Sequence, residues 1–255
     1  MFMLSPKVAV IIPTYNHAHF LSTAIKSIIN QTFKDWEALI INNFSNDDTI
    51  KIVSAFEDPR IKLVNFQNNG IIAASRNYGI SLTQAPIVAF LDSDDLWYPE
   101  KLNKCIEKLK IGYDLVCHAE FWVGPGKKRR KVYYGPENKA TFENLLICGN
   151  CISTSAVVVK REWIEKVEFF SEYPDFVTAE DYDLWLKLAY FGARIGFIKD
   201  LLGEYTLHNT NQSRINLKSM KAVRKVYNYH IPKVKTKINK SRLNQRKANI
   251  IYMGG

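Results

Sequence analysis

Three carboxylates within four residues, Asp92, Asp94 and Asp95, follow the apolar run of residues 88–91. Carboxylates this close repel one another unless a cation neutralises them. Asp92 and Asp94 point the same way in extended backbone, so they could share a divalent ion, or one could hold the ion and the other a ribose. Ligands made only of oxygen select a hard ion such as Mg²⁺ or Mn²⁺. The pattern indicates a metal site; a solvated turn before the next helix is the alternative.

Two other kinds of site find little support. The sequence contains neither a Walker-type loop nor a Gly-x-Gly-x-x-Gly fingerprint, which argues against a P-loop enzyme and a dinucleotide oxidoreductase. Cys148 and Cys151 have the spacing of a redox or zinc pair, but no second Cys or His pair follows at a zinc-binding interval. We expect the four cysteines to be ordinary small residues of a protein in the reducing cytosol.

The acidic run ends the last of four predicted strands, residues 8–12, 36–41, 61–66 and 87–91. Helices are predicted between them: one capped by Asn16, then 47–56 and 71–82. This alternation predicts βαβ units and a Rossmann-like, mostly parallel α/β sheet with helices on both faces. Ligands of such sheets bind at the carboxyl ends of the strands. The segments expected there are 13–16, 42–45 and 92–95.

The second half of the chain is less regular. We predict strands over 114–122 and 151–159, an exposed basic hairpin at 124–131, and helices over 161–167 and 180–191. These elements are expected to complete the sheet that residues 1–112 begin and to build a substrate pocket. Residues 1–213 would then form one domain, with a nucleotide-binding half (1–112) and an acceptor and catalytic half (113–213).

The excess of basic over acidic residues lies at the end of the chain. Among 255 residues, 35 Lys and Arg face 25 Asp and Glu, a net charge of +10. Residues 214–255 hold twelve of the cations and no acid, which leaves 23 cations against 25 acids in residues 1–213. A basic surface over the whole body is therefore excluded. No apolar run approaches the roughly 20 residues that span a bilayer, and residues 1–10 lack a secretory pattern, so we expect a cytoplasmic protein.

Five motifs occur in a recognisable order: Val10-Ile-Ile-Pro-Thr-Tyr-Asn16, Gln31-Thr-Phe33, Asn69-Gly70 with Arg76-Asn77, Phe90-Leu-Asp-Ser-Asp-Asp95, and Glu180-Asp-Tyr-Asp-Leu-Trp185. Each motif alone is weak, but together and at these spacings they resemble family 2 inverting glycosyltransferases of the GT-A fold. The resemblance covers roughly residues 7–213. It implies a hexosyl- or N-acetylhexosaminyltransferase that uses a nucleotide-sugar donor and a divalent metal, Mn²⁺ or Mg²⁺.

The resemblance also assigns roles to single residues. It makes Asp181 the general base and places Glu180 and Trp185 beside the acceptor or behind that base. It gives the metal to Asp94, and to His208 as a second ligand for which a purely structural role is equally open. The residues that would bind the donor nucleotide are Pro13, Thr14, Tyr15, Asn43, Arg76, Asp92 and Ser93.

These roles suit an inverting sugar transfer. One carboxylate takes the proton of the acceptor hydroxyl, and a divalent ion neutralises the departing nucleoside diphosphate. The helix dipole would lower the pKa of Asp181, whereas burial by Tyr182 and Trp185 would raise it, and both directions stay open. The alternative for Glu180 and Asp181 is simple negative charge at the start of a helix.

One position departs from the family pattern. An acidic pair usually follows the second strand, where its second Asp accepts a hydrogen bond from the base. This chain has Asn42 and Asn43 there. An amide oxygen still accepts from uracil N3–H, but its NH₂ group also donates and the negative charge is lost. We expect a UDP-sugar donor and keep other nucleotide sugars open.

The tail begins with a predicted basic amphipathic helix, which ends before Pro232 and carries Leu217, Met220, Val223 and Tyr227 on one stripe. Seven more cations lie between Lys233 and Lys247. Such a segment suits an anionic inner leaflet, so we expect peripheral membrane attachment near a lipid-linked glycan acceptor. A solvated helix packed on the body is the alternative. Nucleic acid is not an expected partner, because the tail has few aromatic residues and the body no basic groove. No feature specifies an oligomeric state.

Two further functions remain as alternatives. A non-catalytic module that binds a sugar nucleotide or glycan could keep the fold, although intact Asp92, Asp94 and Asp181 argue against it. A nucleotidyltransferase also uses acids and Mg²⁺ on an α/β sheet. It usually needs a Gly-rich or basic loop over the triphosphate, whereas the first strand here leads into Pro13-Thr-Tyr-Asn16. By family analogy alone, the acceptor is a surface polysaccharide in the making.

Overall fold

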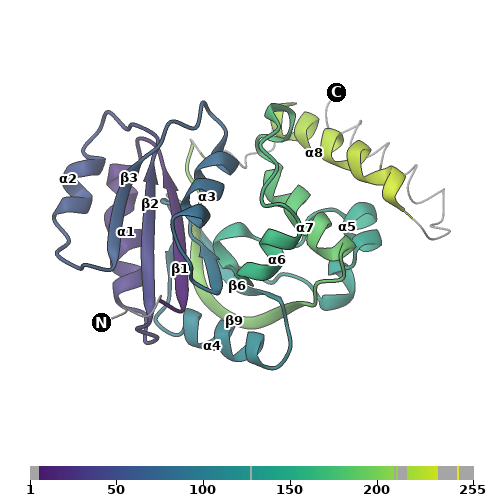
Figure 1. Cartoon of the computed structure of the whole chain (residues 1–255), viewed down its shortest axis with the longest axis horizontal. Coiled ribbons are helices and arrows are strands. Elements are labelled where there is room, and N and C mark those ends of the chain that lie inside the picture. The colour runs from purple at the N-terminus through teal and green to yellow at the C-terminus, as the bar shows by residue number, and fades with distance from the viewer. Residues whose placement is uncertain (1–5, 127, 210, 212–216, 235–245, 247–255) are drawn as a thin grey trace.

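The computed structural model describes residues 6–126, 128–209, 211, 217–234 and 246. Its nine-stranded sheet has the order β3-β2-β1-β4-β8-β6-β9-β5, and β7 pairs with β6 outside this path. The first half is parallel, as predicted. Its strands are β1 (Val8–Thr14), β2 (Trp36–Asn42), β3 (Ile61–Asn65) and β4 (Ile87–Phe90). They lie on the left in Figure 1.

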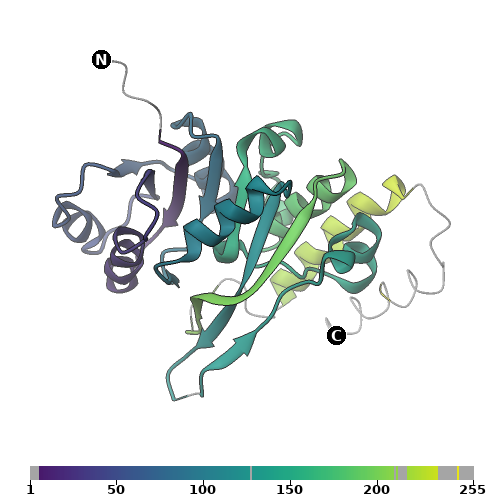
Figure 2. The ribbon, with the colours of Figure 1, turned by 90° about the horizontal axis from the view of Figure 1, so that it is seen from below.

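The second half reverses direction twice. Strand β8 (Val157–Lys160) runs antiparallel to both β4 and β6 (Leu115–Val123), and β9 (Ile195–Thr206) runs parallel to β6. Strands β1, β4, β6 and β9 therefore point the same way, and their carboxyl ends share one edge of the sheet. Short β5 (Leu96–Trp97) and β7 (Arg130–Val132) add antiparallel pairs. Strand β7 completes the predicted basic hairpin, which projects from the body in Figure 2.

Helices cover both faces of the sheet, which confirms the predicted fold class. Successive residues of β1 belong to two separate cores: Ala9 and Ile11 to one, Val8, Val10 and Ile12 to the other. A strand buried on both faces must be apolar throughout, which is why this segment lacks polar alternation. The first core is covered by α3 (Ile72–Ser81), α5 (Phe142–Cys148), α6 (Arg161–Lys166), α7 (Glu180–Tyr190) and α8 (Leu217–His230). The second is covered by α1 (Ala18–Ile29), α2 (Thr49–Ser54) and α4 (Lys101–Lys110). Single 3-10 turns stand at Glu137–Ala140, Thr154–Ala156, Pro174–Phe176 and Ile231–Lys233.

Two local predictions were wrong. Asn16 does not cap the first helix: it has φ +53°, and its Oδ1 accepts from the Asn46 backbone N–H. The Ala18 N–H at the helix start instead donates to Asp47 Oδ2, 2.9 Å away. The strand predicted from residue 151 begins only at Val157, after the turn Thr154–Ala156. The hydroxyls of Thr154 and Ser155 bind carboxylates from other elements, so this stretch serves side-chain contacts instead of a strand ladder.

Helix α8 packs on the body through the second half of its apolar stripe. Val226 and Tyr227 are buried and Val223 packs against the same core, whereas Leu217 is 60% exposed. The helix is fixed to α7 by His230 Nε2, 2.7 Å from Asp183 Oδ1, with both side chains fully buried. The predicted helix is therefore present, but the protein itself covers much of the face assigned to the membrane. The further cations of 235–245 and 247–255 lie outside the described residues.

The structure also bears on the cysteines and on membrane-spanning segments. All four cysteines are free, Cys105 and Cys117 in the core and Cys148 at the surface. Within the described ranges, no helix combines the length and the apolar character required to cross a membrane.

Candidate active site

The loops that follow β1 and β2 are tied to each other at the carboxyl edge of the sheet. The Asn16 N–H donates to Ser45 Oγ (2.9 Å), and the Asn43 N–H donates to the Thr14 carbonyl (3.0 Å). Asn16 and Phe44 both have positive φ angles, +53° and +51°, which turn the chain sharply at the strand ends. The predicted nucleotide loops 13–16 and 42–45 thus form one continuous rim.

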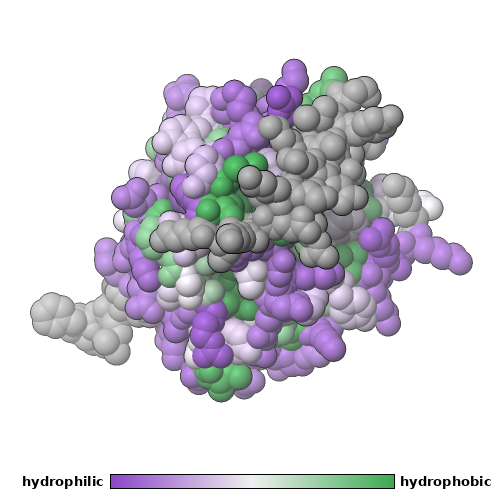
Figure 3. All heavy atoms as spheres, turned by 90° about the vertical axis from the view of Figure 1, so that its right-hand side faces the viewer, coloured by the Kyte–Doolittle hydropathy of each residue, from purple (hydrophilic) through white to green (hydrophobic). Residues whose placement is uncertain are grey.

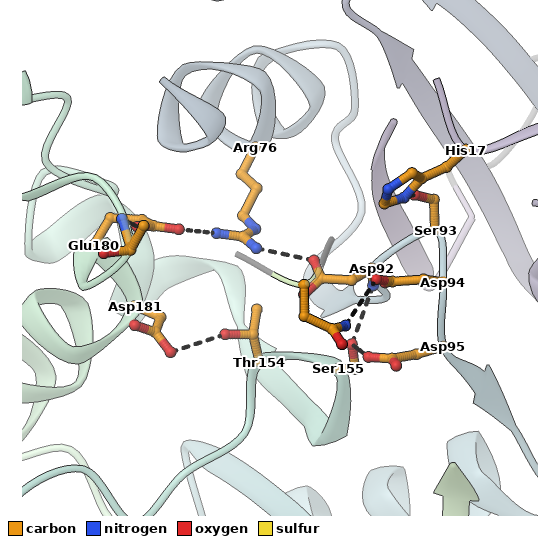
Figure 4. Close-up of polar contacts among 12 residues, drawn as sticks. His17, Arg76, Asp92, Ser93, Asp94, Asp95, Thr154, Ser155, Glu180 and Asp181 are labelled. Atoms are coloured by element: carbon orange, nitrogen blue, oxygen red, sulfur yellow. Dashed lines mark hydrogen bonds and ion pairs between the residues drawn. The ribbon is translucent and has the colours of Figure 1, made fainter. Parts of the chain in front are cut away.

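Asp95 holds the acidic loop in place from below. It is 2% exposed, and its two oxygens accept from Ser155 Oγ (2.5 Å) and from the Thr206 N–H (2.8 Å). Ser155 Oγ also accepts from the Asp92 N–H at 3.1 Å. Burial, and then the charges of Asp94 and Asp92, raise the pKa of Asp95 well above its usual range. Asp95 therefore acts as a positioning residue that links β4, β8 and the end of β9, as Figure 4 shows for Ser155.

Asp94 and His208, the two residues predicted to hold the metal, lie in direct contact. His208 Nε2 lies 2.7 Å from Asp94 Oδ2, and Asn211 Nδ2 donates to the same oxygen at 3.3 Å. Burial and the neighbouring Asp92 raise the pKa of Asp94, while His208 opposes the shift. Carboxylate oxygen suits Mn²⁺ or Mg²⁺, whereas imidazole is more typical of later transition metals, so Asp94 is the better ligand of the pair for either ion. Among the described residues, no group of three or more His, Cys, Asp or Glu is arranged to hold a metal ion.

His17 belongs to this corner of the site, although no role was predicted for it. Its Nδ1 lies 3.0 Å from Ser93 Oγ, and its ring centroid is 5.7 Å from that of His208. The ring of Phe20 packs on His208 at 4.7 Å. Burial lowers the pKa of His17, against the attraction of Asp94. The one sequence signal was its place directly after the Pro13–Asn16 motif.

Arg76 joins the two acidic centres of the site. Its side chain is 3% exposed; Nη2 donates to Asp92 Oδ1 (2.9 Å) and Nη1 to Glu180 Oε1 (2.7 Å). Figure 4 shows the guanidinium lying between these two carboxylates. Burial alone would lower the pKa of Arg76, but Asp92 and Glu180 raise it above its ordinary value. The cation therefore ties α3 both to the loop after β4 and to the start of α7.

Asp181 stands at the start of α7 on the far side of Arg76. Its Oδ2 accepts from Thr154 Oγ1 (3.2 Å) and from Asn150 Nδ2 (3.4 Å). Burial, and then the charge of Glu180, raise the pKa of Asp181 to about 7, although Arg76 opposes them. Of the two directions that the sequence left open, the pKa of Asp181 is thus raised, chiefly by burial. A carboxyl group with this pKa is suited to accept a proton near neutral pH.

The profile of one enzyme family matches residues 9–168, and its description reads glycosyl transferase family 2. The chain belongs to this family. The match spans well over half of the chain and includes all but the first residue of β1, the acidic loop after β4, Arg76 and Thr154.

Relatives in this family share more of the chain. The putative teichuronic acid biosynthesis glycosyltransferase TuaG of Bacillus subtilis (strain 168) is 30% identical over 232 residues, 87% of each chain. An Escherichia coli enzyme, WfgD, is named UDP-Glc:alpha-D-GlcNAc-diphosphoundecaprenol beta-1,3-glucosyltransferase. It is 32% identical over 182 residues, 71% of this chain and 69% of its own. Family 2 members related to this chain thus include enzymes named for polysaccharide biosynthesis and for lipid-linked sugars.

Solved structures agree on the GT-A fold. Staphylococcus aureus TarS 1-349 in complex with UDP-GlcNAc superposes with a TM-score of 0.74 at 18% identity, over 97% of this chain and 72% of that one. The mannosyltransferase PcManGT from Pyrobaculum calidifontis, in complex with GDP-Man and Mn²⁺, gives 0.71 at 18% identity, over 97% and 70%. At these identities the likeness establishes the fold alone.

The remaining predicted site residues of this family 2 chain differ in exposure. Tyr15 is 55% exposed at the rim, whereas Thr14 is 4% exposed. Asn42 is fully buried and engaged internally, since its Nδ2 donates to Asn65 and its Oδ1 accepts from Ser45. Asn43 is half-buried, and its Oδ1 accepts from the Asn68 N–H at 3.0 Å. Of the two amides, Asn43 is therefore the one that a nucleotide base can reach.

Trp185 does not lie where an acceptor could touch it. Its side chain is fully buried in the core beneath α7, so of the two places predicted for it, beside the acceptor or behind the base, its burial fits the second. Indole is the largest apolar side chain, and packing here holds the helix that carries Asp181. Glu180, 6% exposed, likewise acts from behind the base through Arg76 and the Thr178 N–H.

Proposed function

We propose that this chain is a metal-dependent inverting glycosyltransferase. It moves a sugar from a nucleotide-sugar donor, UDP-linked, to a hydroxyl of a glycan or lipid-linked saccharide in surface polysaccharide biosynthesis. One observation carries the proposal: Arg76 holds Asp92 of the acidic loop and Glu180 beside Asp181 at 2.9 and 2.7 Å. A single buried cation thus sets the donor side and the base at a fixed spacing.

The donor side consists of the rim and the acidic loop. Pro13, Thr14, Tyr15 and Asn43 would bind the base, and Asp92 and Ser93 the ribose. Asp94 and His208 would hold the ion, which when bound neutralises the negative charge of the nucleoside diphosphate. His17, through Ser93, keeps this corner of the site in place.

The acceptor side consists of Asp181 and the residues that orient it. Asp181 takes the proton from the acceptor hydroxyl. At the same time the hydroxyl oxygen bonds to the anomeric carbon from the face opposite the nucleotide. The bond from that carbon to the diphosphate oxygen breaks, and its electron pair leaves with the nucleoside diphosphate. The transition state has oxocarbenium character, so the fixed charges around it account for much of the rate. Thr154 and Asn150 keep the carboxylate directed toward the acceptor.

Nucleotide binding is the first test. Thermal unfolding is followed with UDP, GDP, dTDP or CMP, each with Mn²⁺, Mg²⁺ or EDTA. At a hundredfold excess over Kd, a ligand adds about 2.7 kcal/mol, which raises the Tm of a domain this size by roughly 5–10 °C. We expect this rise with UDP and metal, and its loss in Asp94→Ala. Asp200→Ala removes an exposed acid and serves as the control.

The same assay reports on the base. Asn43→Asp restores a purely accepting, negatively charged group where a base can reach it, so the UDP shift should grow in that variant. If no nucleotide gave a metal-dependent shift, the non-catalytic module would become the better description. If UDP were no better than GDP, the uracil assignment would fail while the transferase assignment stood.

We also propose that the basic end of the chain attaches the enzyme to the inner face of the cytoplasmic membrane. The structure leaves the cations of α8 at the surface while the second half of its apolar stripe packs inward, so we expect charge to provide most of the attraction. Electrostatic attachment is screened by salt. In a flotation assay, the full chain should float with vesicles rich in anionic lipid and be released at roughly 0.5 M salt. Equal flotation with neutral vesicles would contradict the proposal.

A further inference from the structure

A basic groove lies between α8 and the segment 174–177. It has a volume of about 590 Å³, and its charged lining consists of four cations and one acid: Lys218, Lys221, Arg224, Lys225 and Asp175. Lys225 Nζ pairs with Asp175 Oδ2 at 2.9 Å. Among the described residues, no carboxylate forms an ion pair with Lys218, Lys221 or Arg224. The groove therefore offers three cations to an anion.

The spacing of these cations directs them to one place. Residues three apart on a helix lie on the same face, so Lys218, Lys221 and Arg224 form one row. Like charges at this spacing destabilise a helix by a few tenths of a kcal/mol per pair. An anion in the groove would remove that repulsion. Figure 3 faces the α8 side of the molecule and shows mainly hydrophilic side chains with scattered hydrophobic ones between them.

The groove lies close to Asp181, the proposed base. Val177 lines it, and Asp181 follows four residues later, a length of chain that spans at most about 14 Å. Its other wall, α8, is locked to α7 by the buried Asp183–His230 contact. Because α7 begins with Glu180 and Asp181, the groove and the base are built on elements that contact each other directly. Figure 1 shows α8 beside α7 on the right of the molecule.

We propose that this groove binds a phosphoryl group of the acceptor, so that the acceptor is a saccharide linked through a phosphate or diphosphate. The inference rests on the proposed function and names its acceptor class. A diphosphate that joins two organic groups carries two negative charges, which offset most of the charge of the row. Lysines bind phosphate as point charges, and the Arg224 guanidinium matches phosphate oxygens in a fork. The donor diphosphate would sit at Asp94 and His208, on the other side of Arg76. Each substrate thus has its own anion site.

The test uses octyl diphosphate as the probe and octyl glucoside as its neutral counterpart, with Kd measured by calorimetry on the full chain. EDTA is present, so that metal-bridged binding at the donor site does not contribute. The variant Lys218→Ser/Lys221→Ser/Arg224→Ser removes the row. The variant Lys26→Ser/Lys51→Ser/Lys110→Ser removes the same charge from exposed positions on α1, α2 and α4 and is the matched control.

We expect the row variant to bind octyl diphosphate at least tenfold more weakly than wild type, and the control variant to stay within twofold. Both should keep the UDP and metal thermal shift, so failure of the groove is distinguishable from failure of the proposed function. Equal weakening in both variants would reduce the effect to net charge and overturn the proposal. If the row variant no longer bound anionic vesicles but still bound octyl diphosphate, the groove would be a surface for lipid headgroups, and the proposal would also be overturned.

Discussion

Asp181→Asn should lower kcat for sugar transfer by about 10²–10⁴-fold, the usual contribution of a general base. The amide has the shape of the carboxylate, and its oxygen can still accept from Thr154 and Asn150, so the fold should be unchanged. It cannot take up the acceptor proton at neutral pH. Because Asp181 lies across Arg76 from the acidic loop, the thermal shift given by UDP and metal should stay within 1 °C of wild type, roughly the scatter of such measurements. If the variant lost both sugar transfer and UDP binding, this assignment would be contradicted.

The pH dependence of the wild type gives an independent check on Asp181. Only the deprotonated carboxylate can act as a base, and the pKa of Asp181 is raised to about 7, chiefly by burial. The value of kcat/KM should therefore fall about tenfold per pH unit below 7 and level off above it. The Thr154 hydroxyl lowers this pKa by stabilising the charged form, so Thr154→Val should move the midpoint upward. A flat profile from pH 5 to 8 would exclude Asp181 as the base.

The sheet could be predicted from sequence because its strands are buried on both faces. Val8–Thr14 and Trp36–Asn42 are buried along their whole length, so composition alone marks them. The loops at their ends were also identifiable, since acids directly after a buried apolar strand indicate a ligand site at the edge of the sheet. Residues 151–156 were not, because Thr154 and Ser155 have strand propensity but bind Asp181 and Asp95, which lie 27 and 60 residues away in sequence. Such contacts exist only once the chain is folded.

The tail is a second case in which contacts between distant residues could not be predicted from a local pattern. An apolar stripe between cations is typical both of a membrane-bound helix and of a helix packed on its own protein. What decides between them here is His230, whose side chain is fully buried against Asp183. No local pattern signals that pair, because Asp183 lies 47 residues earlier, one turn into the helix that carries the base. His17 escaped notice for the same reason, since Ser93 and His208 reach it from distant parts of the chain.

Arg76→Met should be the most damaging single substitution for stability. It keeps an unbranched apolar stem but leaves Glu180, 6% exposed, and Asp92 without their cation. Removing one partner of a buried ion pair typically costs about 3–5 kcal/mol, which lowers the Tm of a domain this size by roughly 10 °C. Lys104→Met is the control: its pair with Asp200 is exposed, so its loss should cost less than about 1 kcal/mol.

A double variant separates the charge of Arg76 from its packing. In Arg76→Met/Glu180→Gln the buried charge of Glu180 is gone, so part of the lost stability should return, and the cycle of single and double variants measures that coupling. Activity should not recover, because Asp92 and the start of α7 are no longer joined. Arg76 also lowers the pKa of Asp181, so any residual transfer by Arg76→Met should have its pH midpoint above that of wild type. If Arg76→Met kept its Tm within 2 °C, roughly the effect of 1 kcal/mol, the acids would not depend on the cation and the proposed spacing of the two substrates would lose its basis.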